Sequence, residues 1–287
     1  MLLNDLMNPE ALQAYVDGLF VEGDERLEDG GIRCGKCGGM KTCHGTGVLE
    51  GILLPIRCEC KKRADDERLN AIHKAEEERR REELRRIGLT SKAYAEKTFA
   101  ADVAPESSVS KMCRRYCEQW SEMKKVNAGL LLYGDVGTGK SFYACCIANE
   151  IIDRYQEQVY VTTIPTLIAK LQSFDNRDKT IATIETVALL VLDDLGAERD
   201  TSFAEEQLFS IIDRRLLSGK PTIVTTNLTF QQMRNSQTTA QRRIFDRVIE
   251  MCPIQMRFDG RNRRADALIS KREQAFDALR RGPCHMD

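Results

Sequence analysis

Residues 134–141 hold the densest group of chemistry-bearing residues in the chain, and they read Gly-Asp-Val-Gly-Thr-Gly-Lys-Ser. Closely spaced glycines let a backbone wrap around an anion so that its N–H groups point inward. In such a loop the lysine reaches the outer phosphates of a nucleotide, and the hydroxyl ligates Mg²⁺. The pattern therefore indicates a site for ATP and magnesium. The residues assigned to it are Gly134, Asp135, Val136, Gly137, Thr138, Gly139, Lys140 and Ser141.

Two adjacent acids follow the strongly apolar run 187–192. A carboxylate at the tip of a buried strand is costly unless it is paired or bound to a metal. We expect Asp193 to contact the magnesium ion through water and Asp194 to orient the water that attacks the nucleotide. The alternative is a pair of acids that begins an ordinary surface loop.

Asn227 and several arginines could act on the terminal phosphate. Asn227 follows the apolar run 221–226, where its amide could hold the attacking water; it could also be an asparagine in a turn. The forked donors of arginine match phosphate oxygens. Each arginine alone is more commonly a surface charge. The candidates are Arg242, Arg243, Arg247, Arg261, Arg263 and Arg264.

Five of the eleven cysteines fall between Cys34 and Cys60. Cys34 and Cys37 form a CxxC pair, and Cys58 and Cys60 form a CxC pair. Two thiolate pairs on turns can close a tetrahedral zinc site. A segment so poor in apolar residues would depend on the metal for its folding energy. Redox activity and disulfides are the alternatives.

Cys43 and His44 lie between the two cysteine pairs, and either could replace one zinc ligand. The cysteines outside the cluster are most simply packing residues.

Hydrophobic periodicity indicates the elements that must position these residues. Short apolar runs alternate with amphipathic segments from residue 129 onward, which predicts an α/β fold with a central parallel sheet flanked by helices. The charged segment 64–87 favours a solvated linker helix over a partner-docking helix. Strands are predicted at 130–133, 159–162, 187–192, 221–226 and 254–258, and helices at 8–20, 64–87, 141–155, 165–174 and 204–217.

Composition and charge exclude several classes of protein. The 287 residues are 42% hydrophobic and 30% charged, as in ordinary globular chains, and the net charge is −1. Nucleic-acid binding would therefore need a local basic patch. No apolar run is long enough to span a membrane, and the N-terminus does not read as a secretory signal. We expect a cytoplasmic protein.

The motif set resembles the bacterial replicative-helicase loaders of the DnaC/DnaI type, which are AAA+ ATPases. The resemblance rests on the runs 130–141, 147–150, 190–198 and 225–227. The cysteine-rich segment ahead of them is similar to the DnaI branch. The resemblance implies an AAA+ P-loop NTPase domain preceded by a small Cys-rich zinc-binding module. The expected boundaries are 1–31 for an N-terminal helix and loop, 32–63 for the zinc module, 64–98 for the linker helix and 99–287 for the ATPase domain.

The resemblance also implies roles for single residues. Lys140 and Ser141 match the Walker A motif, and Asp193 and Asp194 match Walker B. Asn227 matches sensor I, Arg247 matches the arginine finger that reaches a neighbouring subunit's ATP, and Arg264 matches the sensor II arginine. Asp194 stands where most AAA+ enzymes have glutamate, so hydrolysis is expected to be slow, or to be assisted by Glu198.

The implied function is ATP-dependent loading of the replicative DNA helicase onto single-stranded DNA during replication initiation. The implied partners are the helicase, single-stranded DNA and further copies of the chain, and the cofactors are ATP, Mg²⁺ and Zn²⁺. One alternative is a transposition helper ATPase of the IstB type, against which the cysteine cluster argues. The other is an adaptor in which ATP is only a structural ligand.

Overall fold

The computed structural model describes residues 9–196, 201–235, 238–260 and 262–281. They form two compact units that divide between Glu78 and Arg79, inside helix α2 (Glu59–Gly88). The sequence-based boundaries at 31, 63 and 98 stay predictions. Within the described ranges, no helix combines the length and apolar character that crossing a membrane requires.

The first unit is small and built mainly from hairpins. Its antiparallel pairs are β1 with β2 and β3 with β4. The apolar residues buried in its described part are few: Leu12, Val16, Ile32, Cys34 and Cys58. Two of these are cysteines, so packing alone contributes little stability here. Its elements besides α2 are α1 (Pro9–Asp17), β1 (Glu25–Arg26), β2 (Ile32–Arg33), β3 (Thr42–His44), η2 (Gly47–Leu49) and β4 (Leu53–Pro55).

Helix α2 begins in the first unit and ends in the second. It is a 30-residue helix of mostly exposed, charged side chains, and it is longer than the predicted segment 64–87. Its last residue, Gly88, lies against strand β6 (Val159–Thr163), where an added Cβ would come 2.1 Å from the Val159 carbonyl oxygen. The helix ends where the chain meets the edge of the sheet, and Leu89 then forms a β-bridge with Val161.

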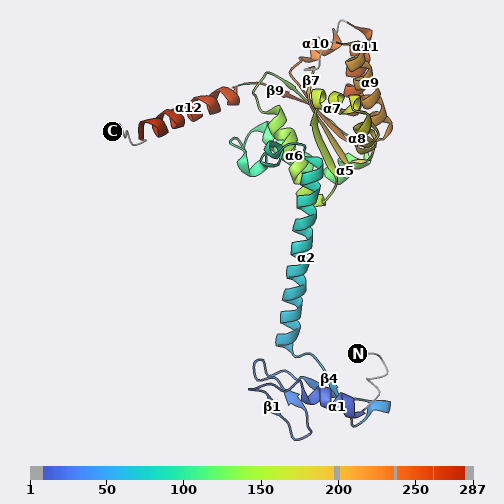
Figure 1. The fold of residues 1–287 in the computed structure, drawn as a ribbon, viewed down its shortest axis with the longest axis vertical. Helices are drawn as coiled ribbons and strands as arrows, with labels where there is room; N and C mark the ends of the chain where they lie inside the picture. Colours follow the sequence, from blue (N-terminus) through green and yellow to red (C-terminus); the bar gives the residue numbers. More distant parts are fainter. Residues whose placement is uncertain (1–8, 197–200, 236–237, 261, 282–287) are drawn as a thin grey trace. The chain divides into compact units, whose positions relative to one another are not determined.

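A five-stranded parallel sheet forms the centre of the second unit (Figure 1). The strand order is β6-β7-β8-β5-β9, and every adjacent pair is parallel. The predicted α/β fold with a central parallel sheet is confirmed. The remaining strands are β5 (Leu130–Gly134), β7 (Leu189–Leu195), β8 (Thr222–Thr226) and β9 (Ile254–Phe258).

Side chains alternate between the two faces of this sheet, and each face has its own core. Leu130 and Leu132 pack with α6, whereas Leu131 packs with helices on the other face. Figure 1 shows helices on both sides of the sheet. The first layer contains α3 (Lys92–Ala95), η3 (Phe99–Ala101), α4 (Ser108–Glu118), α5 (Trp120–Lys125) and α6 (Lys140–Tyr155). The second contains α7 (Ile164–Gln172), α8 (Phe174–Thr186), α9 (Ser202–Leu217), α10 (Phe230–Arg234) and α11 (Thr239–Met251). Helix α12 (Arg263–Arg281) follows β9.

A buried arginine connects the N-terminal ends of strands β7 and β8 to the second helical layer. Arg215 of α9 is 0% exposed, and burial lowers its pKa to about 10, so it stays protonated at neutral pH. Its donors satisfy carbonyl groups where α8 ends and where β7 and β8 begin. The acceptors are the carbonyl oxygens of Ile184, Val187, Ala188 and Pro221 and the hydroxyl of Thr222, at 2.6–3.3 Å.

Replacing Arg215 should therefore cost far more stability than replacing its neighbour. Arg215→Ala leaves several buried carbonyl groups without a hydrogen-bond donor. It should lower the free energy of unfolding by about 3 kcal/mol or more. Arg214 pairs with Glu185 at the surface, and Arg214→Ala should cost at most about 1 kcal/mol. Urea unfolding can be followed by the fluorescence of Trp120, the single, fully buried tryptophan. Equal losses in the two variants would contradict this account of Arg215.

Candidate functional site

The glycine-rich loop connects the end of β5 to the start of α6. Gly134, Gly137 and Gly139 all have positive φ, of 125°, 80° and 106°. At Gly134 an added Cβ would also lie 2.3 Å from the carbonyl oxygen of Phe258 in the neighbouring strand β9. Only glycine fits this turn without displacing β9. The loop therefore requires glycine at these positions, and its role in wrapping an anion stays a prediction.

Lys140 and Ser141 begin helix α6, directly below the loop. The Lys140 side chain is 5% exposed, and its ammonium donates hydrogen bonds to the carbonyl oxygens of Gly134 (2.8 Å) and Asp135 (2.6 Å). The hydroxyl of Thr138 donates to the same Asp135 carbonyl at 2.8 Å. These bonds close the loop on itself and keep the lysine inside it. The helix N-terminus adds positive potential at the same point.

The two predicted acids lie inside β7, because the strand continues to Leu195 instead of ending at residue 192. A β-bulge makes this extension possible, and Asp194 takes a φ of +60° in it. The Thr225 hydroxyl donates to the Asp193 carboxylate at 2.6 Å and accepts from the Asp194 N–H at 2.9 Å. One side chain of β8 therefore orients both acids. Asp193 is 5% exposed, whereas Asp194 is half-buried.

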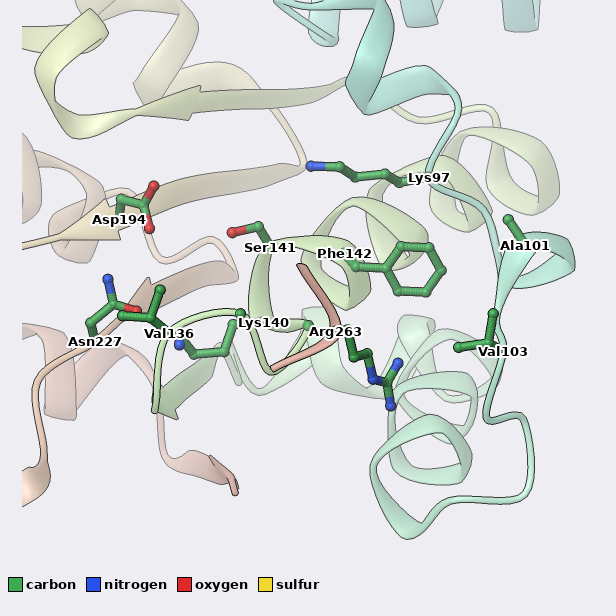
Figure 2. A pocket seen from close by; sticks show the side chains of 12 residues that line it. Lys97, Ala101, Val103, Val136, Lys140, Ser141, Phe142, Asp194, Asn227 and Arg263 are labelled. Carbon is green, nitrogen blue, oxygen red and sulfur yellow. The ribbon is translucent and has the colours of Figure 1, made fainter. Parts of the chain in front are cut away.

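A cavity of about 370 Å³ opens at this edge of the sheet (Figure 2). It brings together residues that the sequence assigned to different motifs, namely Val136, Gly137, Gly139, Lys140, Ser141, Asp194 and Asn227. Gly134, Asp135, Thr138 and Asp193 are not among its lining residues, although hydrogen bonds connect them to the loop or to Thr225. Asn227 follows β8 directly and is exposed at the cavity, which Asp194 also lines (Figure 2).

The arginines have separate positions. Arg247 does not line the cavity: it lies on α11, 41% exposed, and pairs with Asp213 (3.4 Å) and Glu250 (3.0 Å). The side chain of Arg264 and the whole of Glu198 fall outside the described residues, so their roles stay predictions. Arg263, which the sequence analysis named only as one of several arginines, lines the cavity.

Arg263 is attached to the phosphate loop by its backbone and to α6 by its side chain. Its N–H donates to the Gly137 carbonyl at 2.9 Å, and its guanidinium lies over the Tyr143 ring at 5.7 Å. The Tyr143 hydroxyl donates to Asp102 at 3.0 Å. Burial opposes ionisation of Asp102, but hydrogen bonds from Ser110, the Ala104 N–H and Tyr143 outweigh it and lower the pKa of that carboxyl. The Arg263 guanidinium over the Tyr143 ring is therefore attracted by the negative charge of the Asp102 carboxylate.

Sequence reasoning missed the wall of the cavity opposite the sheet. Lys97, Ala101 and Val103 line it from the segment before the first core strand, and Phe142 lines it from α6. No motif marks residues 97–103. The only local signal is Asn149, a buried polar residue in the apolar helix α6, whose amide donates to the carbonyl oxygens of Tyr94 and Lys97.

The first unit holds a separate candidate site, a cluster of four sulfur atoms. The Sγ atoms of Cys34, Cys37, Cys58 and Cys60 all lie within 4.8 Å of one another. The Sγ of Cys60 is 3.5 Å from that of Cys34 and 3.4 Å from that of Cys58. Backbone N–H groups of Cys60 and Gly39 lower the pKa of Cys37 to about 6, while the neighbouring sulfurs raise that of Cys60 to about 12. The four sulfurs fit a tetrahedral cation that favours thiolates, such as zinc.

Cys43 and His44 lie in β3, outside this cluster. Cys43 is exposed, and the Nε2 atom of His44 lies 2.9 Å from the Asp29 carboxylate. Among the described residues, the structure therefore brings together the CxxC and CxC pairs and neither of the two substitutes.

Comparison with known proteins gives consistent matches. A family model described as IstB-like ATP binding protein matches residues 68–265. Replicative helicase loader DnaI of Bacillus subtilis (strain 168) is 30% identical over 151 residues, 47% of this chain and 47% of the relative. Replicative helicase loader DnaC of Escherichia coli (strain K12) is 28% identical over 110 residues, 37% of this chain and 45% of the relative. The chain thus spans about half the length of these relatives.

Two solved structures share the fold. The crystal structure of the DnaI is 24% identical with a TM-score of 0.50, and it covers 61% of this chain and 94% of its own. That of the DnaC helicase loader is 23% identical with a TM-score of 0.50, covering 59% of this chain and 100% of its own. The AAA+ fold and the resemblance to the DnaC/DnaI type are confirmed. Because the family model spans more than half of the chain, this protein belongs to the IstB-like ATP-binding protein family.

Proposed function

We propose that this protein is an ATPase that loads the replicative DNA helicase onto single-stranded DNA during replication initiation. The observation that carries the proposal is the cavity at the carboxyl edge of the sheet, where Lys140, Ser141, Asp194 and Asn227 converge. Relatives named helicase loaders supply the biological context.

In the proposed reaction the loop 134–141, including Lys140, would hold the phosphates. Ser141 and Asp193 would hold Mg²⁺, which would offset phosphate charge. The hydrogen bond from Thr225 fixes one oxygen of the Asp193 carboxylate, which supports a defined orientation for this proposed ligand. Asp194 and Asn227 face the cavity and orient the attacking water. Because an aspartate is one methylene shorter than the usual glutamate, the unstimulated rate should be slow.

Two arginines are proposed to complete the site, one from the same chain and one from a neighbouring copy. Arg263 lines the chain's own cavity and is the better-supported candidate for the sensor II position that the sequence suggested for Arg264. Arg247 is proposed to act on the ATP of a neighbouring copy. Its support is that the side chain is partly exposed on α11, held by two carboxylates, and absent from the lining of its own cavity.

The first unit is proposed to grip the helicase, with zinc held by the four clustered cysteines as its structural support. Its small buried core and the sulfur cluster favour a module whose folding depends on metal. This feature also favours the loader over the second candidate, a transposition helper ATPase, whose support is the IstB-like family description.

Recovery of partners should separate these two candidates. Tagged protein incubated with ATP should retain a purified replicative helicase and should not retain a transposase of the IstB-associated kind. A variant that ends the chain before residue 79 should keep helicase binding, because the division at Glu78 leaves the cysteine unit whole. Retention of the transposase alone would reverse the assignment.

Metal analysis should find about one zinc per chain in protein purified without chelator. Cys58→Ser should abolish zinc binding, because three thiolates leave the site open. Cys43→Ser is the matched control: this cysteine lies in the same unit, outside the cluster, and its loss should leave the zinc content unchanged. If Cys58→Ser keeps its zinc while Cys43→Ser or His44→Ala loses it, the ligand set is wrong.

Hydrolysis should depend on assembly if Arg247 acts in trans. Isolated chains should bind ATP and hydrolyse it slowly, and single-stranded DNA should raise the rate by aligning subunits. Arg247→Ala should retain ATP binding and lose most of the stimulated rate, since such arginines contribute ~10³–10⁵ in rate where they act this way. The measurement is phosphate release against protein concentration.

Mixing variants makes the test specific. Lys140→Ala chains lack a phosphate-binding pocket but keep the arginine, and Arg247→Ala chains have the opposite defect. Mixed together, they should recover part of the stimulated rate. Arg234→Ala, which changes an exposed arginine on the preceding helix α10, is the control and should behave as wild type. A rate per chain that is independent of concentration and DNA, and insensitive to Arg247→Ala, would favour the adaptor alternative.

A further inference from the structure

Lys97 lies in the cavity although it belongs to none of the nucleotide-binding motifs. It comes from the segment between α3 and η3, ahead of the first strand of the sheet. Figure 2 shows its ammonium end extending toward the side of the cavity where Ser141 and Asp194 lie. Ala101 and Val103, from the same segment, line a different and apolar part of the wall.

The backbone at Lys97 is fixed to the phosphate-loop helix. The Asn149 amide of α6, 1% exposed, donates to the carbonyl oxygens of Tyr94 (2.9 Å) and Lys97 (3.0 Å). Because both acceptors belong to the segment that carries the lysine, this segment cannot slide along α6 without breaking two partly buried hydrogen bonds. The starting point of the Lys97 side chain is thus set relative to Lys140 and Ser141.

The charge of Lys97 is not neutralised by a carboxylate within the described ranges. Its ammonium lies over the Tyr94 ring, 5.1 Å from the centroid, and it forms no ion pair with any residue that the structure describes. Lys140 differs, because its ammonium is occupied by loop carbonyl groups. A half-buried ammonium directed into a cavity and held by a ring face keeps its hydrogen-bonding capacity for an anion.

We propose that Lys97 binds the terminal phosphate of the nucleoside triphosphate and thereby makes the site discriminate ATP from ADP. This rests on the proposed nucleotide site. The outer phosphates belong on the side of Ser141 and Asp194, where the lysine tip points, whereas the apolar wall suits a base. ADP lacks the phosphate in question, so it cannot use this contact. Lys97 is therefore a specificity-determining residue distinct from the loop lysine.

The test measures two affinities for each variant in the presence of Mg²⁺: that of a non-hydrolysable ATP analogue and that of ADP, by titration calorimetry. Lys97→Met keeps the stem and removes the charge. It should weaken the analogue about tenfold, which corresponds to about 1.4 kcal/mol, and leave ADP within about twofold. Lys97→Arg should restore most of the difference. Lys92→Met, an exposed lysine on the neighbouring α3, is the control and should match wild type.

The outcomes are distinguishable. Equal weakening of both nucleotides, or an unchanged ratio in Lys97→Met while Lys140→Ala abolishes binding, would overturn the role of Lys97 and leave the nucleotide site intact. Failure of the wild type to bind either nucleotide would overturn the proposed site itself. A Lys97→Met variant that keeps the ratio but loses the DNA-stimulated rate would place the lysine at a subunit contact, against the proposal.

Discussion

The pairing of β5 between β8 and β9, with β7 on the far side of β8, is the constraint on which the second unit depends. Parallel strands end at one edge, so this order brings the phosphate loop, the acids of β7 and Asn227 together from distant parts of the chain. The side chain of Thr225 links the strands, because it bonds both acids across the β7–β8 pair. A shift of β8 by one residue would turn Thr225 to the opposite face and leave Asp193 without its partner.

How much of the structure the sequence could predict depends on how far apart in the sequence the interacting residues lie. The glycine loop and the two cysteine pairs are local, because their spacing alone determines which groups can converge. The alternation of apolar runs with amphipathic segments is also a local pattern, and it predicted the parallel sheet. The continuation of β7 to Leu195 could not be foreseen, since it depends on a bulge stabilised by a threonine about thirty residues away. Hydrophobic periodicity also did not predict helices α3, α4, α5, α8, α10 and α12.

The position of Lys97 could not be foreseen either. It is set by Asn149, a residue on a different element, and no pattern within residues 90–103 predicts that contact. Arg263 shows a related limit. Spacing from a motif was the only basis for choosing among neighbouring arginines, whereas in the structure the Arg263 N–H bonds the Gly137 carbonyl. The interiors of the two units also differ. One has a continuous apolar core on each sheet face, and the other has four clustered sulfur atoms and few buried apolar side chains.

The hydrogen bond from the Arg263 N–H to the Gly137 carbonyl joins the phosphate loop directly to the first residue of α12. Loop movement at Gly137 must therefore either break this bond or rotate the start of a 19-residue helix. A helix of that length extends about 28 Å, so a rotation of about ten degrees at its first turn would carry its last turn through about 5 Å. The helix would thus act as a lever about Gly137, and a small displacement of the loop would be amplified at the far end of the helix.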